Sequence, residues 1–324
     1  MTFYPVVIPT LNRFEHFRNC VESLERCTYA DKTELIIGLD FPPSEKYIEG
    51  YKKIKEYIPS IKSFKNVICL ERSENYGAAK NSTDLKDYAF QRYDACIYTE
   101  DDNIFSPAFL DFINKGLEKY KDDPNVVAVC GYSYPIEWET RATSVLQHQY
   151  FSAWGYGEWK DKMKRMYSDF SPTCLGKYLE KKNNRNNFRH LSDKNFRYAA
   201  NWIFCNEIPF FDITLSVYLC VTGKNVLMPT ESLVRNNGWD GSGVHCSLDD
   251  LMFSSQPICL EQTFSIFPVE LVSKNLERFN RQIGNDYRRL FFVSGIKYIL
   301  LSVFGYKNSL KIYSLLKKVK HRNC

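Results

Sequence analysis

An alternation of strand and helix patterns over residues 1–132 constrains the fold of this chain more than any other feature. Short apolar runs typical of buried strands are separated by longer segments in which apolar residues recur at helical spacing. The expected strands are residues 4–8, 34–40, 66–70, 95–100 and 126–132, and the later helices are 46–58, 78–93 and 107–120. Because strands that alternate with helices form a largely parallel sheet covered on both faces, we expect an α/β fold.

The first expected helix begins with a recognisable signal. Asn12 is followed three residues later by Glu15, which together are typical of a capping box. Apolar side chains then recur at helical spacing, at Phe14, Phe17, Val21 and Leu24. The sequence therefore predicts a helix capped by Asn12.

Composition bounds the class and size of the protein. Of its 324 residues, 44% are hydrophobic and 25% charged, which excludes a disordered or collagen-like chain. This length allows one large α/β domain or two smaller ones. We expect three parts, namely residues 1–132, residues 133–286 with a helix at 202–222, and a tail at 287–324.

The distribution of charge limits the kind of molecule that this protein can bind. The tail contains nine Lys or Arg and no acid, whereas the rest of the chain contains 34 basic and 38 acidic residues. A uniformly basic surface is absent, so we expect no nucleic-acid partner.

The 11 cysteines include no C-x-x-C pair, which disfavours a zinc site or a disulfide framework. With no signal-peptide pattern and no apolar run of about 18 residues, the sequence predicts a cytoplasmic protein.

Three consecutive acids lie at the end of the fourth expected strand: Glu100, Asp101 and Asp102. Their mutual repulsion is relieved either by solvent at a surface turn or by a divalent cation. Carboxylate oxygens suit Mg²⁺ or Mn²⁺, which also bridge phosphate oxygens. Ligands of parallel sheets bind beyond the carboxyl ends of the strands, where Asp40 also lies. Spacing alone leaves both interpretations open, a metal site and a solvated acidic turn.

Three later residues are candidates for chemistry. His245 ends a glycine-rich run and is either a metal ligand or a structural side chain. Asp212 lies among aromatic and aliphatic residues, so it is either a paired structural group or a carboxylate tuned for proton transfer. Glu207 is the competing base.

Two connections offer groups that can hold a phosphate. Thr10, Asn12 and Arg13 join the first strand to the first helix, which places backbone N–H groups and a guanidinium where a phosphate or nucleoside can bind. The alternative is a capped helix start. Gly77 permits a tight turn before Lys80, which either contacts a phosphate or is solvated.

These motifs, in this order, resemble those of GT-A glycosyltransferases, close to the family 2 enzymes and similar to the N-acetylglucosaminyltransferase I group. They span residues 4–246, and the ordered set is more specific than any single member. The matching segments are VVIPTLNR, IIGLD, NYGAAKN, YTEDD, PAFLDF, AWGYGEWKDKM, the Phe-Asp-Ile segment and NNGWDGSGVHC.

The resemblance implies a GT-A fold and an inverting, metal-dependent transfer of a hexosyl or N-acetylhexosaminyl group from a nucleotide-sugar, with UDP as the expected nucleotide. It implies that Asp102 and His245 hold Mn²⁺ or Mg²⁺ and that Asp212 is the general base. The implied donor-binding residues are Thr10, Asn12, Arg13, Asp40, Lys80 and Asp101.

The same resemblance assigns functions to the parts of the chain. Residues 1–132 become the nucleotide-sugar-binding half, and residues 133–286 become the acceptor-binding and catalytic half. The family's usual Asp-x-Asp is Glu-Asp-Asp here, which leaves open whether one or two of these acids touch the metal. The aromatic cluster from Trp154 to Trp159 could stack on sugar rings, although core packing accounts for at least one tryptophan.

Two other classes of function compete with sugar transfer. One is a nucleotide- or carbohydrate-binding module without catalysis. Asp212 and His245 both facing the strand-end cleft would favour the enzyme, and either one pointing into the core would favour the module. The other is a nucleotidyltransferase, which shares acids at strand ends and a metal. The glycine-rich, lysine-containing phosphate loop of that class is absent from the N-terminal region of this sequence.

The tail at 287–324 interleaves basic and apolar residues in helical segments, which suits the surface of an anionic membrane. We therefore expect peripheral contact with the inner face of the cell membrane and a saccharide or lipid-linked saccharide acceptor. The alternative is that residues 290–304 pack on the catalytic domain and that only residues 317–322 form a solvated end.

Overall fold

The structure is a computed structural model that divides the chain into two compact units. The first comprises Met1–Gln147, Ser152–Lys162 and Val226–Glu270, and the second His148–Phe151, Met163–Asn225 and Leu271–Cys324. These units are defined by how the chain packs and not by what each part binds. The functional halves expected from the sequence therefore stay a prediction. The structure describes residues 1–136, 138, 145–181, 184, 193–207, 210–241, 255–264, 268–269 and 287–322.

The first unit holds the strands and four long helices. Its strands are β1 (Val6–Thr10), β2 (Glu34–Leu39), β3 (Asn66–Glu71), β4 (Ala95–Tyr98), β5 (Asn103–Phe105), β6 (Val126–Cys130), β7 (Val145–His148), β8 (Tyr156–Trp159), β9 (Asn225–Pro229), β10 (Val234–Asn236) and β11 (Pro268–Val269). Its helices are α1 (Phe14–Glu25), α2 (Ile48–Tyr57), α3 (Gly77–Phe90) and α4 (Phe109–Lys119), with short 3-10 turns at Ala30–Lys32, Glu45–Tyr47 and Ile58–Ser60.

The described residues of the second unit are largely helical. A helix that begins in the first unit, α5 (Lys160–Asp169), leads into it. It is followed by α6 (Pro172–Glu180), α8 (Asp193–Cys205), α9 (Phe211–Thr222) and α12 (Tyr287–Arg322).

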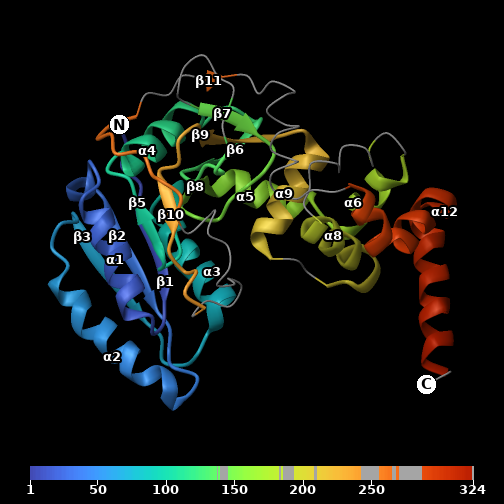
Figure 1. Ribbon diagram of the computed structural model, residues 1–324, viewed down its shortest axis with the longest axis horizontal. Coiled ribbons are helices and arrows are strands. Elements are labelled where there is room, and N and C mark those ends of the chain that lie inside the picture. The colour runs from blue at the N-terminus through green and yellow to red at the C-terminus, as the bar shows by residue number, and fades with distance from the viewer. Residues whose placement is uncertain are drawn as a thin grey trace. The chain divides into compact units, whose positions relative to one another are not determined.

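The described strands form a nine-stranded sheet in the order β3-β2-β1-β4-β8-β6-β9-β7-β11, and β5 pairs separately with β10 (Figure 1). In the sheet, β1 lies parallel to β2 and β4, and β2 lies parallel to β3. β8 runs antiparallel between β4 and β6. The expected α/β fold is therefore confirmed. The strand β8 was not expected from the sequence, and it lies within the aromatic cluster.

The chain reverses its direction of travel across the sheet at β1. It moves outward from β1 through β2 to β3, and then returns to place β4 on the other side of β1. Connections that leave two adjacent parallel strands in opposite directions create a crevice beyond their carboxyl ends. The segments that follow β1 and β4, residues 11–13 and 99–102, meet at this edge.

Helices cover both faces of the sheet and hold this edge in place. Successive strand residues point to opposite faces, so Val6 and Ile8 of β1 share one face. They belong to a core that also includes Phe17 of α1. On the other face α3 contacts β1, β2 and β4, with Leu85 and Ala89 fully buried. Burial on both faces explains why β1 and β4 read as continuous apolar runs.

The first strand differs from its expected bounds. It begins at Val6 and continues through Pro9 to Thr10, although proline is rare in central strands. Pro9 is tolerated because β4 pairs only with Val6 and Val7 of β1, so the missing N–H of Pro9 interrupts no bond toward β4.

The capping box expected at Asn12 does not form. Arg13 occupies the N-cap position of α1 without a side-chain cap, and the Asn12 backbone carbonyl accepts a hydrogen bond from the Phe14 N–H at 3.0 Å. The prediction was wrong because the loop after β1 is shaped by contacts with distant acids, which the local pattern does not contain. The apolar helix expected at 202–222 is also two helices, because Asn206 adopts a positive φ of 56° beyond the end of α8.

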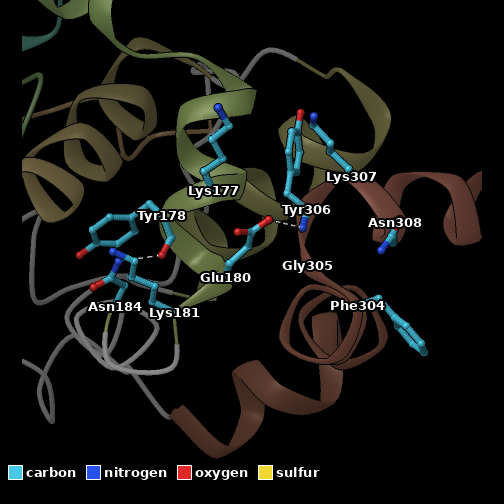
Figure 2. A pocket seen from close by; sticks show the side chains of 10 residues that line it. All are labelled: Lys177, Tyr178, Glu180, Lys181, Asn184, Phe304, Gly305, Tyr306, Lys307 and Asn308. Atoms are coloured by element: carbon cyan, nitrogen blue, oxygen red, sulfur yellow. Dashed lines mark hydrogen bonds between the residues drawn. The ribbon is translucent and has the colours of Figure 1, made fainter.

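The C-terminal tail is helical, as expected, and bends at its centre. Gly305 has φ 70° and ψ 171°, a conformation that is essentially restricted to glycine. α12 contacts α6 and α8, and it buries Tyr298 and Leu301 before the bend and Tyr306 after it. The bend forms one side of a pocket whose other side is α6 (Figure 2). No helix in the described part of the chain is long and apolar enough to cross a membrane.

A buried lysine provides a test of the packing beside β8. Lys162 Nζ donates to the carbonyls of Tyr120, Asp123 and Val126 at 2.7, 2.9 and 2.8 Å. Lys162→Met should lower the free energy of unfolding by about 2–3 kcal/mol, because buried carbonyls lose a charged donor. Urea denaturation measures this change, and the exposed Lys164→Met is the matched control. Equal stability of the two variants would contradict the prediction.

Candidate functional site

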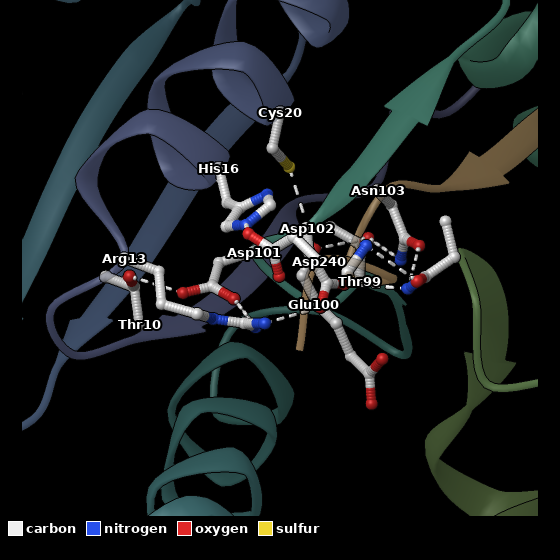
Figure 3. A network of polar contacts seen from close by, with 12 residues as sticks. Thr10, Arg13, His16, Cys20, Thr99, Glu100, Asp101, Asp102, Asn103 and Asp240 are labelled. Atoms are coloured by element: carbon white, nitrogen blue, oxygen red, sulfur yellow. Dashed lines mark hydrogen bonds and ion pairs between the residues drawn. The ribbon is translucent and has the colours of Figure 1, made fainter. Parts of the chain in front are cut away.

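The candidate site lies beyond the carboxyl ends of β1 and β4, where the strand order reverses. Thr10 and Arg13 come from the segment after β1, and Asp101 and Asp102 come from the segment after β4. Figure 3 shows these four side chains converging, although about 90 residues separate the two segments in sequence. The structure thus brings together four residues that the sequence analysis had named separately.

Arg13 bridges the two carboxylates. Its Nη1 donates to Asp102 Oδ2 at 2.8 Å, and its Nη2 donates to Asp101 Oδ1. Thr10 Oγ1 donates to Asp101 Oδ2 at 2.8 Å. The planar guanidinium suits this arrangement because its donors diverge in a fixed fork that can serve two carboxylates at once.

Asp102 is held from the opposite side by the β5–β10 pair. Asn236 of β10 donates through Nδ2 to Asp102 Oδ1 at 2.8 Å, and also to Asn103 of β5 at 3.1 Å. The loop after β10 passes so close that a Cβ at Gly238 would lie 2.4 Å from Asp102 Oδ2. Only glycine fits at this position without displacing the carboxylate. Neither Asn236 nor Asn103 was a sequence candidate, because amides in two short strands give no local signal.

Keeping the charged groups of this cluster away from water costs free energy. Asp101 and Asp102 are only 5% and 6% exposed. Burial raises the pKa of Asp101, which Arg13 lowers in part and the neighbouring Asp102 raises further. Burial by itself lowers the pKa of Arg13, but the two carboxylates outweigh it and the net pKa is raised. One guanidinium facing two carboxylates leaves an excess negative charge.

Asp101 and Asp102 supply the type of ligand atom that a divalent cation prefers. Two buried carboxylates with excess negative charge present the hard oxygen ligands that Mg²⁺ and Mn²⁺ prefer. The described residues include no cluster of three or more His, Cys, Asp or Glu side chains that could hold a metal ion. His245, the second expected ligand, lies outside the described residues. The Glu100 carboxylate points away from Arg13 in Figure 3.

A second polar pair, not expected from the sequence, borders the acids. His16 of α1 and Asp240 of the loop after β10 lie 2.8 Å apart, between His16 Nε2 and Asp240 Oδ2. Figure 3 shows this pair beside Asp102. The position of His16, three residues after Arg13 on a helix, was the one available signal, since residues three apart share a helix face.

Asp40 binds the start of α3 in this structure. Its carboxylate accepts the backbone N–H groups of Tyr76 and Gly77 at 2.7 and 2.8 Å, and the Asn75 amide at 3.3 Å. A carboxylate at a helix N-terminus satisfies free donors and complements the helix dipole. This contact explains why Asp40 is 4% exposed. Its contact with a nucleoside stays a prediction.

Two further candidates for donor binding, Lys80 and Asn12, contact residues that are close to them in the sequence. Lys80 lies in the first turn of α3, with its Nζ 3.5 Å from the centre of the Tyr76 ring and 3.6 Å from Glu74 Oε1. Asn12 contributes its backbone carbonyl to the start of α1. The contacts of both residues with a donor stay predictions.

The two candidate bases belong to the second unit. Asp212 lies in the first turn of α9, as expected for an acid at a helix start, and is half-buried. Glu207 follows α8 and accepts a hydrogen bond from Asn201 Nδ2 at 2.9 Å, while Asn201 Oδ1 accepts one from Lys297 of α12. Glu207 is therefore part of a chain of polar contacts between helices.

The two tryptophans of the aromatic cluster differ in burial. Trp159 is 1% exposed and donates to the Leu117 carbonyl at 3.2 Å, which confirms that one tryptophan of the cluster packs in the core. Trp154 is half-buried, and its ring lies 4.7 Å from that of Tyr132 and 6.1 Å from that of Trp239. Sugar stacking on Trp154 stays a prediction.

A match to a known protein family covers more than half of the chain. The sequence model described as glycosyl transferase family 2 matches residues 6–198. A comparison with curated protein sequences finds no match. Solved structures similar in part include a mannosyltransferase from Pyrobaculum calidifontis in complex with GDP-Man and Mn²⁺, at 18% identity and a TM-score of 0.35, covering 51% of this chain and 46% of that one.

Two structures of TarS from S. aureus are also similar in part. TarS 1–349 shares 9% identity at a TM-score of 0.39, covering 70% of this chain and 57% of that one. TarS 1–349 in complex with UDP-GlcNAc shares 11% identity at a TM-score of 0.35, covering 52% and 47%. This chain thus spans about half the length of these structures. The family assignment rests on the sequence match.

Replacing Arg13 tests the electrostatics of the acid pair. In EDTA at pH 7, Arg13→Gln should lower the free energy of unfolding by about 3–5 kcal/mol, because it leaves two buried carboxylates without a cation. A carboxyl group whose pKa is raised in the folded state adds stability as the pH falls through that pKa, so the deficit should shrink from pH 7 to pH 5.

Thermal unfolding with and without Mn²⁺ measures both effects. Mn²⁺ should raise the Tm of Arg13→Gln more than that of the unsubstituted protein, because a bound cation replaces the missing charge. Arg18→Gln, on the same helix with exposed Glu15 and Glu22 partners, is the control. A Tm of Arg13→Gln equal to that of the control at pH 7 would contradict the electrostatic role of Arg13.

Proposed function

Because the chain belongs to glycosyl transferase family 2, we propose that it is an inverting, metal-dependent glycosyltransferase. The proposed donor is a UDP-sugar, and the proposed acceptor is a saccharide or lipid-linked saccharide. The observation that carries this proposal is the buried pair Asp101 and Asp102 at the point where the strand order reverses. The narrower similarity to the N-acetylglucosaminyltransferase I group, and the choice between hexosyl and N-acetylhexosaminyl transfer, belong to the same proposal.

The acid pair supports a defined division of tasks on the donor side. Asp102 would hold a Mn²⁺ or Mg²⁺ ion, which when bound neutralises the charge of a leaving diphosphate. Asp101 is positioned by Thr10 and Arg13, so its contact with the donor would be fixed before binding. Arg13 is itself a candidate for a phosphate contact if it shifts from the acids.

The proposed general base is Asp212. Inverting transfer needs a carboxylate that removes the proton of the acceptor hydroxyl as the new bond forms. Asp212 lies in the first turn of α9 and is half-buried. The competing residue, Glu207, is engaged with Asn201 and through it with Lys297, which favours a structural role.

Peripheral contact with the inner face of a cell membrane completes the proposal. The C-terminal helix α12 carries all nine basic residues of the tail, and a lipid-linked acceptor would lie at such a surface. This contact is independent of the chemistry at the acid pair and can be tested without a known acceptor.

The metal role of Asp102 is tested by calorimetry. Asp102→Asn should abolish the Mn²⁺-dependent part of UDP binding, because an amide is a much weaker ligand than a carboxylate. Asp122→Asn, an exposed acid after α4, is the control for the loss of one charge. If Asp102→Asn binds UDP with unchanged dependence on Mn²⁺, Asp102 does not hold the metal.

The role of Asp212 is tested by steady-state kinetics of donor consumption. Asp212→Asn should lower kcat by about 10²-fold or more, the usual scale for loss of a general base, with donor affinity retained. Glu207→Gln keeps the hydrogen-bonding shape of its side chain and should leave kcat within about twofold. A near-normal kcat in Asp212→Asn together with a large loss in Glu207→Gln would transfer the assignment to Glu207.

A further inference from the structure

The bend of α12 forms a cavity that the proposed sugar transfer does not use. We call it the kink pocket; it has a volume of about 640 Å³ and lies between the end of α6 and the two halves of α12 (Figure 2). Its polar lining comes mainly from Lys177, Lys181, Asn184, Lys307 and Asn308. This volume is typical of sites that take a small ligand or a headgroup.

The kink pocket has an excess of positive charge. Three lysines line it, two from the end of α6 and one from α12, and all three are exposed. Among the described residues none of these three ammonium groups has an ion-pair partner. The single acid of the lining, Glu180, already accepts the backbone N–H of Tyr306. Figure 2 shows the Lys177 and Lys307 amino groups extending to the same side as the Tyr306 hydroxyl. Several cations around one cavity attract an anion.

An exposed apolar surface adjoins the kink pocket. The turns of α12 before the bend expose Ile296, Ile299, Val303 and Phe304, which we call the apolar ridge. Three of them follow each other at spacings of three and four residues, which places them on one face of the helix. Ile296 and Val303 are 69% and 65% exposed, and Phe304 also lines the kink pocket. Phe304 therefore belongs both to the apolar ridge and to the lining of the kink pocket.

We propose that the kink pocket and the apolar ridge form a docking surface for an anionic phospholipid membrane. The pocket lysines bind the phosphate of a lipid headgroup, and the ridge enters the boundary between headgroups and acyl chains. This inference rests on the proposed membrane contact of α12 and names its residues, but it does not depend on the sugar transfer. The proposal assigns membrane binding to the kink pocket and the apolar ridge, and not to a general attraction between the basic tail and an anionic membrane.

Charge complementarity selects a membrane over the other possible occupants. A soluble anion would fill the pocket but leave the apolar ridge in water. A second copy of this chain would cover the ridge but would bring two sets of pocket lysines together, and like charges across an interface are costly. An anionic leaflet satisfies both surfaces, because phosphates and acyl chains lie at successive depths.

Vesicle co-sedimentation of the full chain tests this proposal. Vesicles of phosphatidylcholine with phosphatidylglycerol are compared with vesicles of phosphatidylcholine alone. One lysine near an anionic leaflet changes binding about fivefold, so the triple variant Lys177→Gln, Lys181→Gln and Lys307→Gln should lose on the order of 100-fold in partition coefficient. The control carries the same loss of charge in the first unit, as Lys52→Gln, Lys62→Gln and Lys65→Gln, and should lose far less.

A second variant tests the ridge, and the oligomeric state tests the alternative. Val303→Ser with Phe304→Ser changes exposed side chains only and should weaken binding to anionic vesicles by about tenfold or more, on the scale of two buried apolar groups. If the pocket and control triple variants lose the same amount of vesicle binding, the kink pocket is not the binding site, although the basic tail can still contact the membrane. No binding of the unsubstituted chain would overturn both. A dimer in sedimentation velocity that the ridge variant dissociates would assign the ridge to a second copy and overturn the proposal.

Discussion

Two buried carboxylates lie side by side beyond the end of β4, and one guanidinium from the segment after β1 faces both of them. Ionised groups can remain buried only when opposite charges and hydrogen bonds replace the lost water. This requirement links the two central strands, because Arg13 must reach the acids and Thr10 must meet Asp101. The sheet order that puts β1 beside β4 therefore brings Thr10 and Arg13 to the two acids.

The surroundings of the acid pair follow from the same constraint. The β5–β10 pair supplies Asn236 to one oxygen of Asp102, and the following loop approaches so closely that residue 238 has to be glycine. A neighbouring carboxylate, Asp40, binds the start of α3 and thereby ties that helix to the end of β2. These contacts arrange the polar groups before any ligand arrives, which is the property that makes charged sites effective in catalysis.

The second unit obeys a different constraint, set by its long C-terminal helix. This helix, α12, contacts both α6 and α8. Gly305 permits the bend, which leaves the apolar ridge exposed on the turns before it and forms, together with α6, a pocket lined by three lysines. Exposed apolar side chains that form a continuous patch usually mark a contact surface. The bend at Gly305 thus shapes both the packing of this unit and the surface that we propose for membrane docking.

The sequence by itself determined the α/β architecture, because buried parallel strands and amphipathic helices have periodicities that can be read locally. It also identified Asp101, Asp102, Thr10 and Arg13 as polar residues at strand ends, and the ordered motifs agreed with the family assignment. The functions of Lys80, Asp212 and His245 remain predictions of the sequence.

Only the tertiary structure decided which of these groups meet. The capping signal at Asn12 failed because Arg13, at the helix start, is held by acids 88 and 89 residues away. The antiparallel strand β8 and the amide of Asn236 gave no usable local pattern, and the His16–Asp240 pair gave only the spacing of His16 from Arg13. The physical reason is that local patterns record which face of an element is buried, whereas the pairing of charges depends on contacts between segments far apart in the chain.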